Sequence, residues 1–276
     1  MITDSLYKLL YRLIKSRPYS AFQMLLHGDL EYRIYRDMQF LLSTAALHKE
    51  TFPQFRNINA GKDVVIVACG PSVQNYIPIK DAIHIGVNKA LLAKHITFDY
   101  WFCEDFFGAT KEYKEFVRNY RPNECKKFFG LSNIEDKRCC AMSYDPPGMD
   151  VFLTKNSFRY RHEFNSGIRG GESELTYDLA TLPFSCLGTV TFSAIQFALW
   201  TNPKRLFLVG CDCTNDGHFY LKENKYNLNL SKVLSGYSKF KSFSEKFYPD
   251  TKVISVNPVG LKGMFKDWNQ KDGPLS

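Results

Sequence analysis

Short apolar runs alternate with helical or polar segments from Gly61 onwards. The clearest run, residues 64–68 (VVIVA), is mostly β-branched and is typical of a strand buried on both faces of a parallel sheet. Apolar positions at helical spacing predict helices over residues 191–200 and 231–247. Further strands are predicted at residues 83–87, 98–103, 127–131, 205–210 and 252–256. Alternating strands and helices predict an α/β fold, a Rossmann-like and mostly parallel sheet flanked by helices.

Residues 1–60 follow a different pattern and predict a helical N-terminal appendage to the Rossmann-like domain of residues 61–276. Basic residues stand between apolar ones at helical spacing over residues 5–17, and Pro18 interrupts this pattern. A basic amphipathic helix suits peripheral attachment to the acidic inner leaflet of a membrane. It suits equally a helix that packs on the main domain or on another subunit, so homo-oligomer formation stays open.

The segment from residue 136 to residue 183 is rich in Gly, Pro, Ser and charged residues. Stretches of this length without regular structure are usually functional or disordered. The sequence therefore predicts either a long loop region or a mobile lid there.

Composition narrows the environment and the partners of the chain. The 276 residues are 45% apolar, and 36 Lys and Arg against 28 Asp and Glu give a net charge of +8, which favours anionic partners. No nucleic-acid-binding pattern is present and the basic residues are dispersed, so nucleic acid is not an expected partner. The eight Cys include no CxxC pair, and several lie in apolar strand-like runs, which favours reduced thiols in the cytoplasm. No apolar run approaches the roughly 20 residues of a membrane span.

Polar residues follow four of the predicted strands, and ligands of open α/β sheets bind beyond such carboxyl ends. Gly70, Pro71 and Ser72 follow the first strand: glycine allows close backbone approach, and N–H groups at a helix start attract phosphate. A tight connection is the alternative interpretation. Asn88 follows the second strand and either binds a ligand or caps a helix.

The other two strand ends carry candidate acids and bases. Glu104 and Asp105 follow the third strand and either hold a divalent ion or a sugar hydroxyl, or cap a helix. Asp212 follows the strand at residues 205–210, and the loop after it contains His218 and Tyr220. A histidine titrates near neutral pH, which makes His218 a candidate general acid or base.

Four blocks in this order resemble bacterial sialyltransferases of the lipooligosaccharide type, and still more the motility-associated-factor glycosyltransferases. The resemblance extends over about residues 61–260. The blocks are VVIVACGPSVQNY (64–76), GVNKA (86–90), GTVTFSAIQFALW (188–200) and RLFLVGCD (205–212).

The resemblance implies roles for individual residues in a nucleotide-sugar-binding catalytic domain. Gly70, Pro71 and Ser72 would line the nucleotide phosphate, and Asn88 would contact the donor. Glu104 and Asp105 would be polar donor-site residues, while Gly188 and Thr189 would begin the helix that touches the base or ribose. Asp212 would end the strand beneath it. Apart from the resemblance, Tyr220 in the loop after that strand is a further candidate for donor binding. The chain departs from the family at Cys69, where the sialyltransferases have Asn, and at His218, which lies closer to its strand than their general base.

The expected activity is transfer of a sugar, of nonulosonic or sialic type, from a CMP-activated donor to a cell-surface glycan or glycolipid acceptor. His218 is the expected base, with Glu104 or Asp105 in reserve. An Asp-x-Asp motif is absent, so no metal is expected to be essential, although Glu104 and Asp105 leave room for Mg²⁺. Two alternatives remain open: a pterin-type diphosphokinase that uses Mg-ATP, and a non-catalytic nucleotide-sugar-binding subunit of surface-polysaccharide assembly.

Overall fold

The computed structural model describes residues 40–104, 106, 109–132, 156–163, 174–221 and 229–275. The chain divides into two compact units, Met1–Ser43 and Thr44–Ser276, and the description below concerns the second. Asp105, the basic helix predicted over residues 5–17 and most of the segment from 136 to 183 lie outside the described residues. No helix among the residues described is long and apolar enough to cross a membrane.

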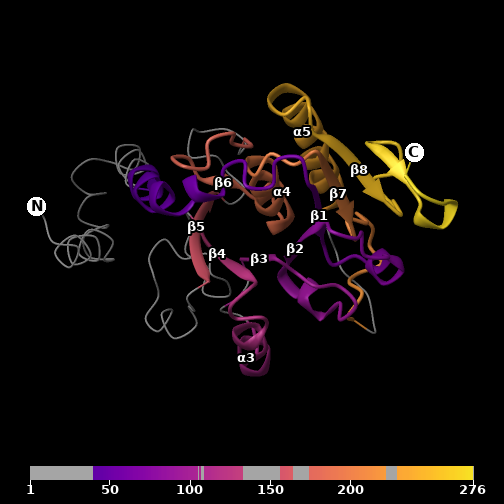
Figure 1. Cartoon of the computed structure of the whole chain (residues 1–276), viewed down its shortest axis with the longest axis horizontal. Coiled ribbons are helices and arrows are strands. Elements are labelled where there is room, and N and C mark those ends of the chain that lie inside the picture. Colours follow the sequence, from indigo (N-terminus) through magenta and orange to yellow (C-terminus); the bar gives the residue numbers. More distant parts are fainter. Residues whose placement is uncertain are drawn as a thin grey trace, which may run out of the picture. The chain divides into compact units, whose positions relative to one another are not determined.

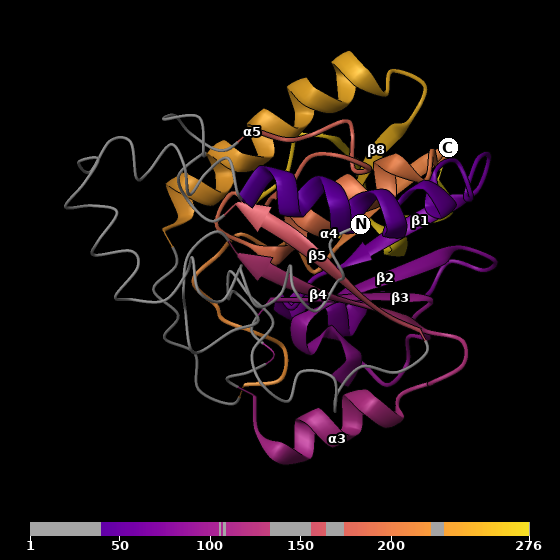
Figure 2. The same ribbon diagram turned by 90° about the vertical axis from the view of Figure 1, so that its left-hand side faces the viewer.

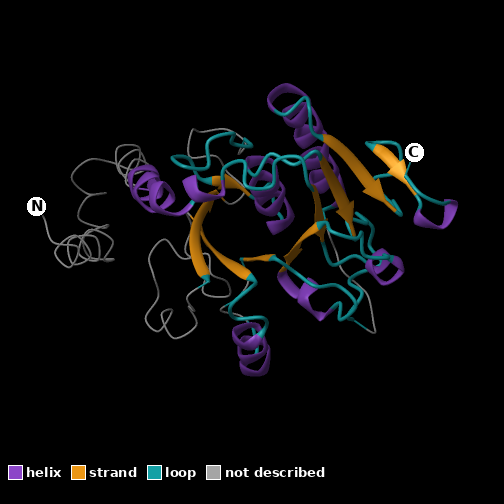
Figure 3. Cartoon of the chain, viewed as in Figure 1, coloured by secondary structure: helices purple, strands orange, loops and turns teal. Residues whose placement is uncertain are grey.

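The described strands form one parallel sheet in the order β6-β5-β4-β3-β2-β1-β7-β8-β9 (Figures 1 and 3), which confirms the predicted fold class. All six strands predicted from the sequence are present. The strands are β1 (Asp63–Val67), β2 (Ile83–Val87), β3 (Tyr100–Cys103), β4 (Lys126–Ser132), β5 (Ser157–Glu163), β6 (Phe184–Ser185), β7 (Arg205–Val209), β8 (Lys252–Val256) and β9 (Lys266–Trp268).

The order of the strands reverses at β1, which pairs with β2 on one side and with β7 on the other. Val64 is in register with Ile83 of β2 and with Leu206 of β7. In an open parallel sheet, the crevice beyond such a reversal is the usual place for a ligand. The loops after β1 and β7 are therefore the first place to look for a site.

Helices cover both faces of this sheet. The helices α4 (Val190–Trp200) and α5 (Leu230–Phe247) confirm the two predicted from the sequence, and a third, α3 (Lys111–Asn119), was not predicted. Figures 1 and 2 show α3 and α5 on opposite sides of the sheet. Every residue of α4 is buried, as expected of a helix that is apolar on all sides. Short 3₁₀ helices occur at η1 (Pro53–Phe55), η2 (Pro71–Asn75), η3 (Asn88–Leu92) and η5 (Gln270–Asp272).

An aromatic cluster fills the core beside α4. Phe102 and Phe128 stack with ring centroids 4.5 Å apart, and Phe197 of α4 lies 4.9 Å from Phe128. Phe52 and Phe55 complete the cluster, with 0% and 1% of their surface exposed. Residues 44–60 therefore belong to the same compact unit as the sheet, and this unit begins at Thr44.

The segment predicted as a loop region or lid contains a strand. Residues 157–163 (SFRYRHE) form β5, which pairs with β4 over six residues from Lys127↔Ser157 to Ser132↔His162. The sequence hides this strand because three of its seven residues are charged. Arg161 and Glu163 are nevertheless buried, with 7% and 8% of their surface exposed.

Candidate functional site

The loop after β1 lies directly against the loop after β7. The N–H of Gly70 donates to the carbonyl of Gly210 at 2.8 Å. A Cβ atom on residue 70 would lie 2.5 Å from both Asp212 Cγ and the Gly210 carbonyl oxygen, closer than real Cβ contacts allow. Only glycine fits at position 70, and its absence of a side chain lets the two strand ends meet.

Asp212 joins these two strand ends by hydrogen bonds. The N–H of Ser72 donates to Asp212 Oδ2 at 2.8 Å, and the Ser72 hydroxyl donates to Oδ1. Pro71 is the first residue of η2, so the carboxylate of Asp212, in the loop after the neighbouring strand β7, caps that short helix. Asp212 is only 7% exposed, and this burial raises the pKa of its carboxyl group. Ser72 therefore uses both of its donors inside the protein.

Asn88 directly follows β2 and has a backbone conformation that few residue types adopt. Its φ is 45°, in the left-handed region where asparagine is among the favoured residues. Its carbonyl oxygen accepts hydrogen bonds from Trp101 Nε1 at 2.6 Å and from the Tyr113 hydroxyl at 2.8 Å. The backbone at Asn88 is thus held by β3 and α3, and Lys89 follows it as an exposed cation.

The loop after β7 returns to the end of β1 and brings two predicted site residues with it. Phe219 stands between His218 and Tyr220 in the sequence, and its N–H donates to the carbonyl oxygen of Cys69 at 3.0 Å. The rings of His218 and Tyr220 stack with centroids 5.2 Å apart, and Lys89 Nζ lies 5.0 Å from the centre of the Tyr220 ring. The ends of β1, β2 and β7 therefore meet around these side chains.

Burial lowers the pKa of His218, and the charge of Lys89 lowers it further, against a smaller opposing effect of a backbone hydrogen bond to Cys69. A free histidine has a pKa near 6.5. His218 is consequently neutral at pH 7, the state in which an imidazole accepts a proton.

Glu104 lies at the end of β3 in a buried polar cluster. The Tyr160 hydroxyl of β5 donates to Glu104 Oε1 at 3.0 Å, and the Ser193 hydroxyl of α4 donates to the same atom at 2.9 Å. Burial raises the pKa of Glu104 to about 7, although both hydrogen bonds oppose this shift. A Cβ on Gly130 would lie 2.7 Å from Glu104 Cγ, so a glycine on β4 makes room for this side chain.

The start of α4 lies one turn before Ser193. Gly188 has a φ of 90°, and Thr189 is the N-cap, whose side chain accepts a long hydrogen bond of 3.4 Å from Thr191 N. The turn therefore needs glycine at position 188, and the first N–H groups of α4 point out of the helix at this end.

One group of metal-ligand types occurs among the residues described. Donor atoms of Glu104, His162 and Cys186 lie within 4.8 Å of one another, and all three residues are buried. Structural zinc sites normally have four protein ligands, so this group of three is one ligand short of such a site.

The structure brings the predicted residues together in two groups. The first group contains the junction of β1 and β7, the loop after β7 and the end of β2, with the predicted residues Gly70, Pro71, Ser72, Asp212, His218, Tyr220 and Asn88. The second group contains Glu104, which is hydrogen-bonded to α4, and the start of that helix at Gly188 and Thr189. Sequence reasoning missed Lys89, although it directly follows the strand-end Asn88. It also missed Tyr113, Tyr160, His162 and Ser193, because three of them lie on β5 or α3, elements that were not predicted, and pairing across the sheet has no local sequence signal.

Comparisons with known proteins give one structural likeness to report. No family model and no curated protein matches the sequence. Among solved structures, the MAf glycosyltransferase from Magnetospirillum magneticum AMB-1 matches with a TM-score of 0.47 and 14% sequence identity. The match covers 84% of this chain and 39% of that one, so the chain spans about two fifths of that protein.

Proposed function

We propose that this protein is a glycosyltransferase that moves a sugar of nonulosonic or sialic type from a CMP-activated donor to a glycan acceptor. The observation that carries the proposal is the convergence at the reversal of strand order. There the Gly70–Asp212 junction, the cation of Lys89 and the stacked pair of His218 and Tyr220 meet at one edge of a parallel sheet. Ligands of such sheets bind at this place.

The donor is expected to bind with its phosphate near two sources of positive potential. The first N–H groups of α4, after Gly188 and Thr189, supply the positive end of an 11-residue helix. Lys89 supplies a full charge at the end of β2. Because Ser72 donates to Asp212, its expected role is to hold the loop in shape, and the phosphate would be bound by these other groups.

The proposed reaction is a direct displacement. An acceptor hydroxyl attacks the anomeric carbon of the donor sugar, the bond from that carbon to the phosphate oxygen breaks, and its electron pair leaves with CMP. The hydroxyl proton passes to the neutral imidazole of His218. Glu104 or Asp105 is the alternative acceptor of this proton, and the raised pKa of Glu104 lets it exchange protons near neutral pH.

Nucleotide binding tests the proposal directly. Thermal melting is measured with CMP, UMP, GDP, CDP and ATP, each with and without Mg²⁺, because a ligand that binds only the folded state raises the melting temperature. We expect a metal-independent shift with CMP, followed by CMP release from a CMP-nonulosonic acid when a glycan acceptor is added. A shift with Mg-ATP alone would replace the proposal with pyrophosphate transfer, and binding without turnover would indicate a non-catalytic subunit.

A further inference from the structure

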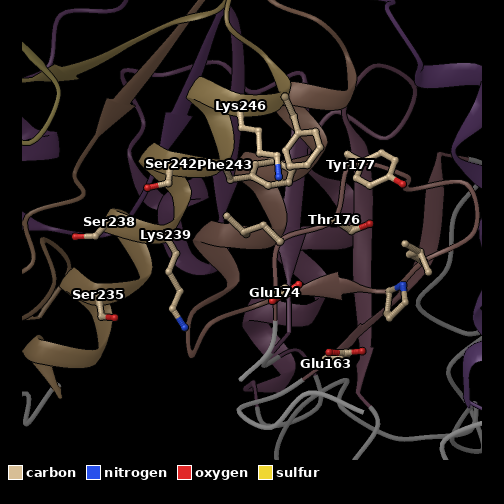
Figure 4. Close-up of a pocket in the computed structure, with 14 residues that line it drawn as sticks. Glu163, Glu174, Thr176, Tyr177, Ser235, Ser238, Lys239, Ser242, Phe243 and Lys246 are labelled. Atoms are coloured by element: carbon tan, nitrogen blue, oxygen red, sulfur yellow. The ribbon is translucent and has the colours of Figure 1, made fainter. Parts of the chain in front are cut away.

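A groove of about 850 Å³ lies between α5 and the segment that precedes β6 (Figure 4). Glu174, Leu175, Thr176 and Tyr177 line one side, and Ser235, Ser238, Lys239, Ser242 and Lys246 of α5 line the other. Glu163, the last residue of β5, also contributes to the lining. A volume of this size is typical of ligand pockets. No step of the proposed reaction uses this groove.

The groove begins beside the proposed donor site and leads away from it. A Cβ on Gly236 would lie 2.7 Å from the ring of Phe192, so this part of α5 packs on the first turn of α4, just after Gly188 and Thr189. Ser235 lines the groove at that end and Phe247 lines it at the far end. The helix rises about 18 Å between these two residues. An occupant that fills the groove is therefore elongated.

The face that α5 turns to the groove carries hydroxyl and ammonium groups as well as Phe243 and Phe247. Ser235, Ser238, Lys239, Ser242 and Lys246 follow one another at helical spacing, and all five are exposed. Glu163 and Glu174 balance the two lysines, so the lining has a net charge of zero. This arrangement offers many hydrogen bonds without selecting for charge, which suits a neutral polyhydroxyl chain and not a polyanion.

The far end of the groove carries an exposed pair of aromatic rings. Tyr177 and Phe247 stack with centroids 5.2 Å apart and planes 16° apart, and 57% and 41% of their surfaces are exposed. Ligand pockets are commonly lined by aromatic side chains together with a few polar groups. The flat apolar face of a sugar ring is complementary to such a surface.

We infer that this groove binds a neutral oligosaccharide of several sugar rings, with Tyr177 and Phe247 holding the end distant from the reaction. Its role as the acceptor chain rests on the proposed function, whereas oligosaccharide binding itself does not. The hydroxyl to be modified would then lie at the Ser235 end, next to the start of α4.

Calorimetric titration of the full chain tests the inference with lactose, lacto-N-neotetraose, maltotetraose and a heparin tetrasaccharide. We expect at least one neutral tetrasaccharide to bind five-fold or more tightly than lactose. Tyr177→Ala and Lys239→Ala should each weaken that binding at least five-fold. Lys241→Ala is the matched control because Lys241 is an exposed lysine of α5 that does not line the groove, and it should bind as the unchanged protein does.

Three results would overturn the inference: binding of no neutral tetrasaccharide, preference for the heparin fragment, or equal binding by the Tyr177 and Lys239 variants. Thermal shifts with CMP on the same variants separate the two proposals. A thermal shift with CMP but no oligosaccharide binding would contradict only the inference about the groove. Oligosaccharide binding without a thermal shift with CMP would contradict the proposed function and support the inference about the groove.

Discussion

At the scale of single residues, Glu104 has a carboxyl group that water cannot solvate. Only 6% of the residue is exposed, and its two hydrogen-bond donors, Tyr160 and Ser193, are uncharged. The charged form therefore loses solvation, and His162, whose Nδ1 lies 3.8 Å from Glu104 Oε1, attracts it only when the imidazole is protonated. This is the physical reason why the pKa rises from 4.5 to about 7.

This shift predicts a pH dependence of stability that Glu104→Gln should remove. Because the folded pKa is the higher one, the folded state keeps a proton that the unfolded chain releases, so stability is lost as the pH rises from 4.5 through about 7. We expect the unchanged protein to lose about 3 kcal/mol relative to Glu104→Gln between pH 4.5 and pH 8. Urea unfolding at several pH values measures this difference. Glu115→Gln, at an exposed position on α3, is the control, and parallel curves for Glu104→Gln and the unchanged protein would contradict the explanation.

The role proposed for His218 also has a pH signature. His218→Asn should reduce turnover by about 10²- to 10⁴-fold, the usual contribution of a general base. The acid limb of turnover of the unchanged protein should lie at a lower pH than the 6.5 of a free histidine, because burial lowers the pKa of His218. The pH–rate profile measures both effects, and His95→Asn, at an exposed position, should keep the unchanged profile. Retention of the acid limb by His218→Asn would assign the base to another residue.

At the scale of elements, the junction of β1 and β7 depends on the absence of a side chain at Gly70. Gly70→Ala puts a methyl group 2.5 Å from Asp212 Cγ and from a backbone carbonyl, so the two loops must separate. We expect a loss of about 1–3 kcal/mol, as for other overpacked sites, and a weaker thermal shift with CMP. Asn75→Ala, exposed in the same 3₁₀ helix, should change stability by no more than about 0.5 kcal/mol. Chemical denaturation compares the two variants, and equal stabilities would show that the junction is loose.

The packing of α5 on α4 predicts that replacing Gly236 by alanine destabilises the protein, the opposite of the usual effect inside a helix. Replacing glycine by alanine inside a helix normally stabilises by about 1 kcal/mol. At Gly236 the added methyl would lie 2.7 Å from the buried Phe192 ring, so Gly236→Ala should destabilise by about 1–2 kcal/mol net. Ser238→Ala, exposed on the same helix, should be neutral or slightly stabilising. Melting temperatures test the contrast, which fails if Gly236→Ala melts higher than the unchanged protein.

The burial of each strand explains which strands can be predicted from the sequence. β1 and β7 are recognisable because they are buried on both faces and therefore read as unbroken apolar runs. β5 is not, because its charged residues become buried only once β4 and the residues around it are in place. The motif at residues 70–72 is visible locally, but Asp212, which engages Ser72, is 140 residues away. Contacts of this kind, like those of Glu104 with Tyr160 and Ser193, exist only in the assembled sheet.

At the scale of the whole molecule, the start of the α/β unit can be tested by truncation. A chain beginning at Thr44 keeps Phe52 and Phe55 in the aromatic core and should fold cooperatively. A chain beginning at Gly61 loses both rings, and with them a hydrogen bond of 3.0 Å from Trp200 Nε1 to the Phe52 carbonyl. Loss of two buried phenylalanines costs about 6–10 kcal/mol, comparable to the total stability of a typical domain. Circular dichroism melting should show a cooperative transition only for the longer chain. Equal transitions for both chains would show that the α/β unit does not need residues 44–60.

The position of β1 in the sheet also has a consequence for synthesis on the ribosome. β1 pairs on one side with β2, which follows about twenty residues later, and on the other side with β7. Arg205 of β7, which binds Asp63 of β1, is synthesised 142 residues after it. Until then the nascent chain presents residues 64–67, four β-branched apolar residues, along an open strand edge. A ribosome that pauses before residue 205 therefore exposes a template for aggregation, and binding of a nascent-chain chaperone to this strand would be most useful in that interval.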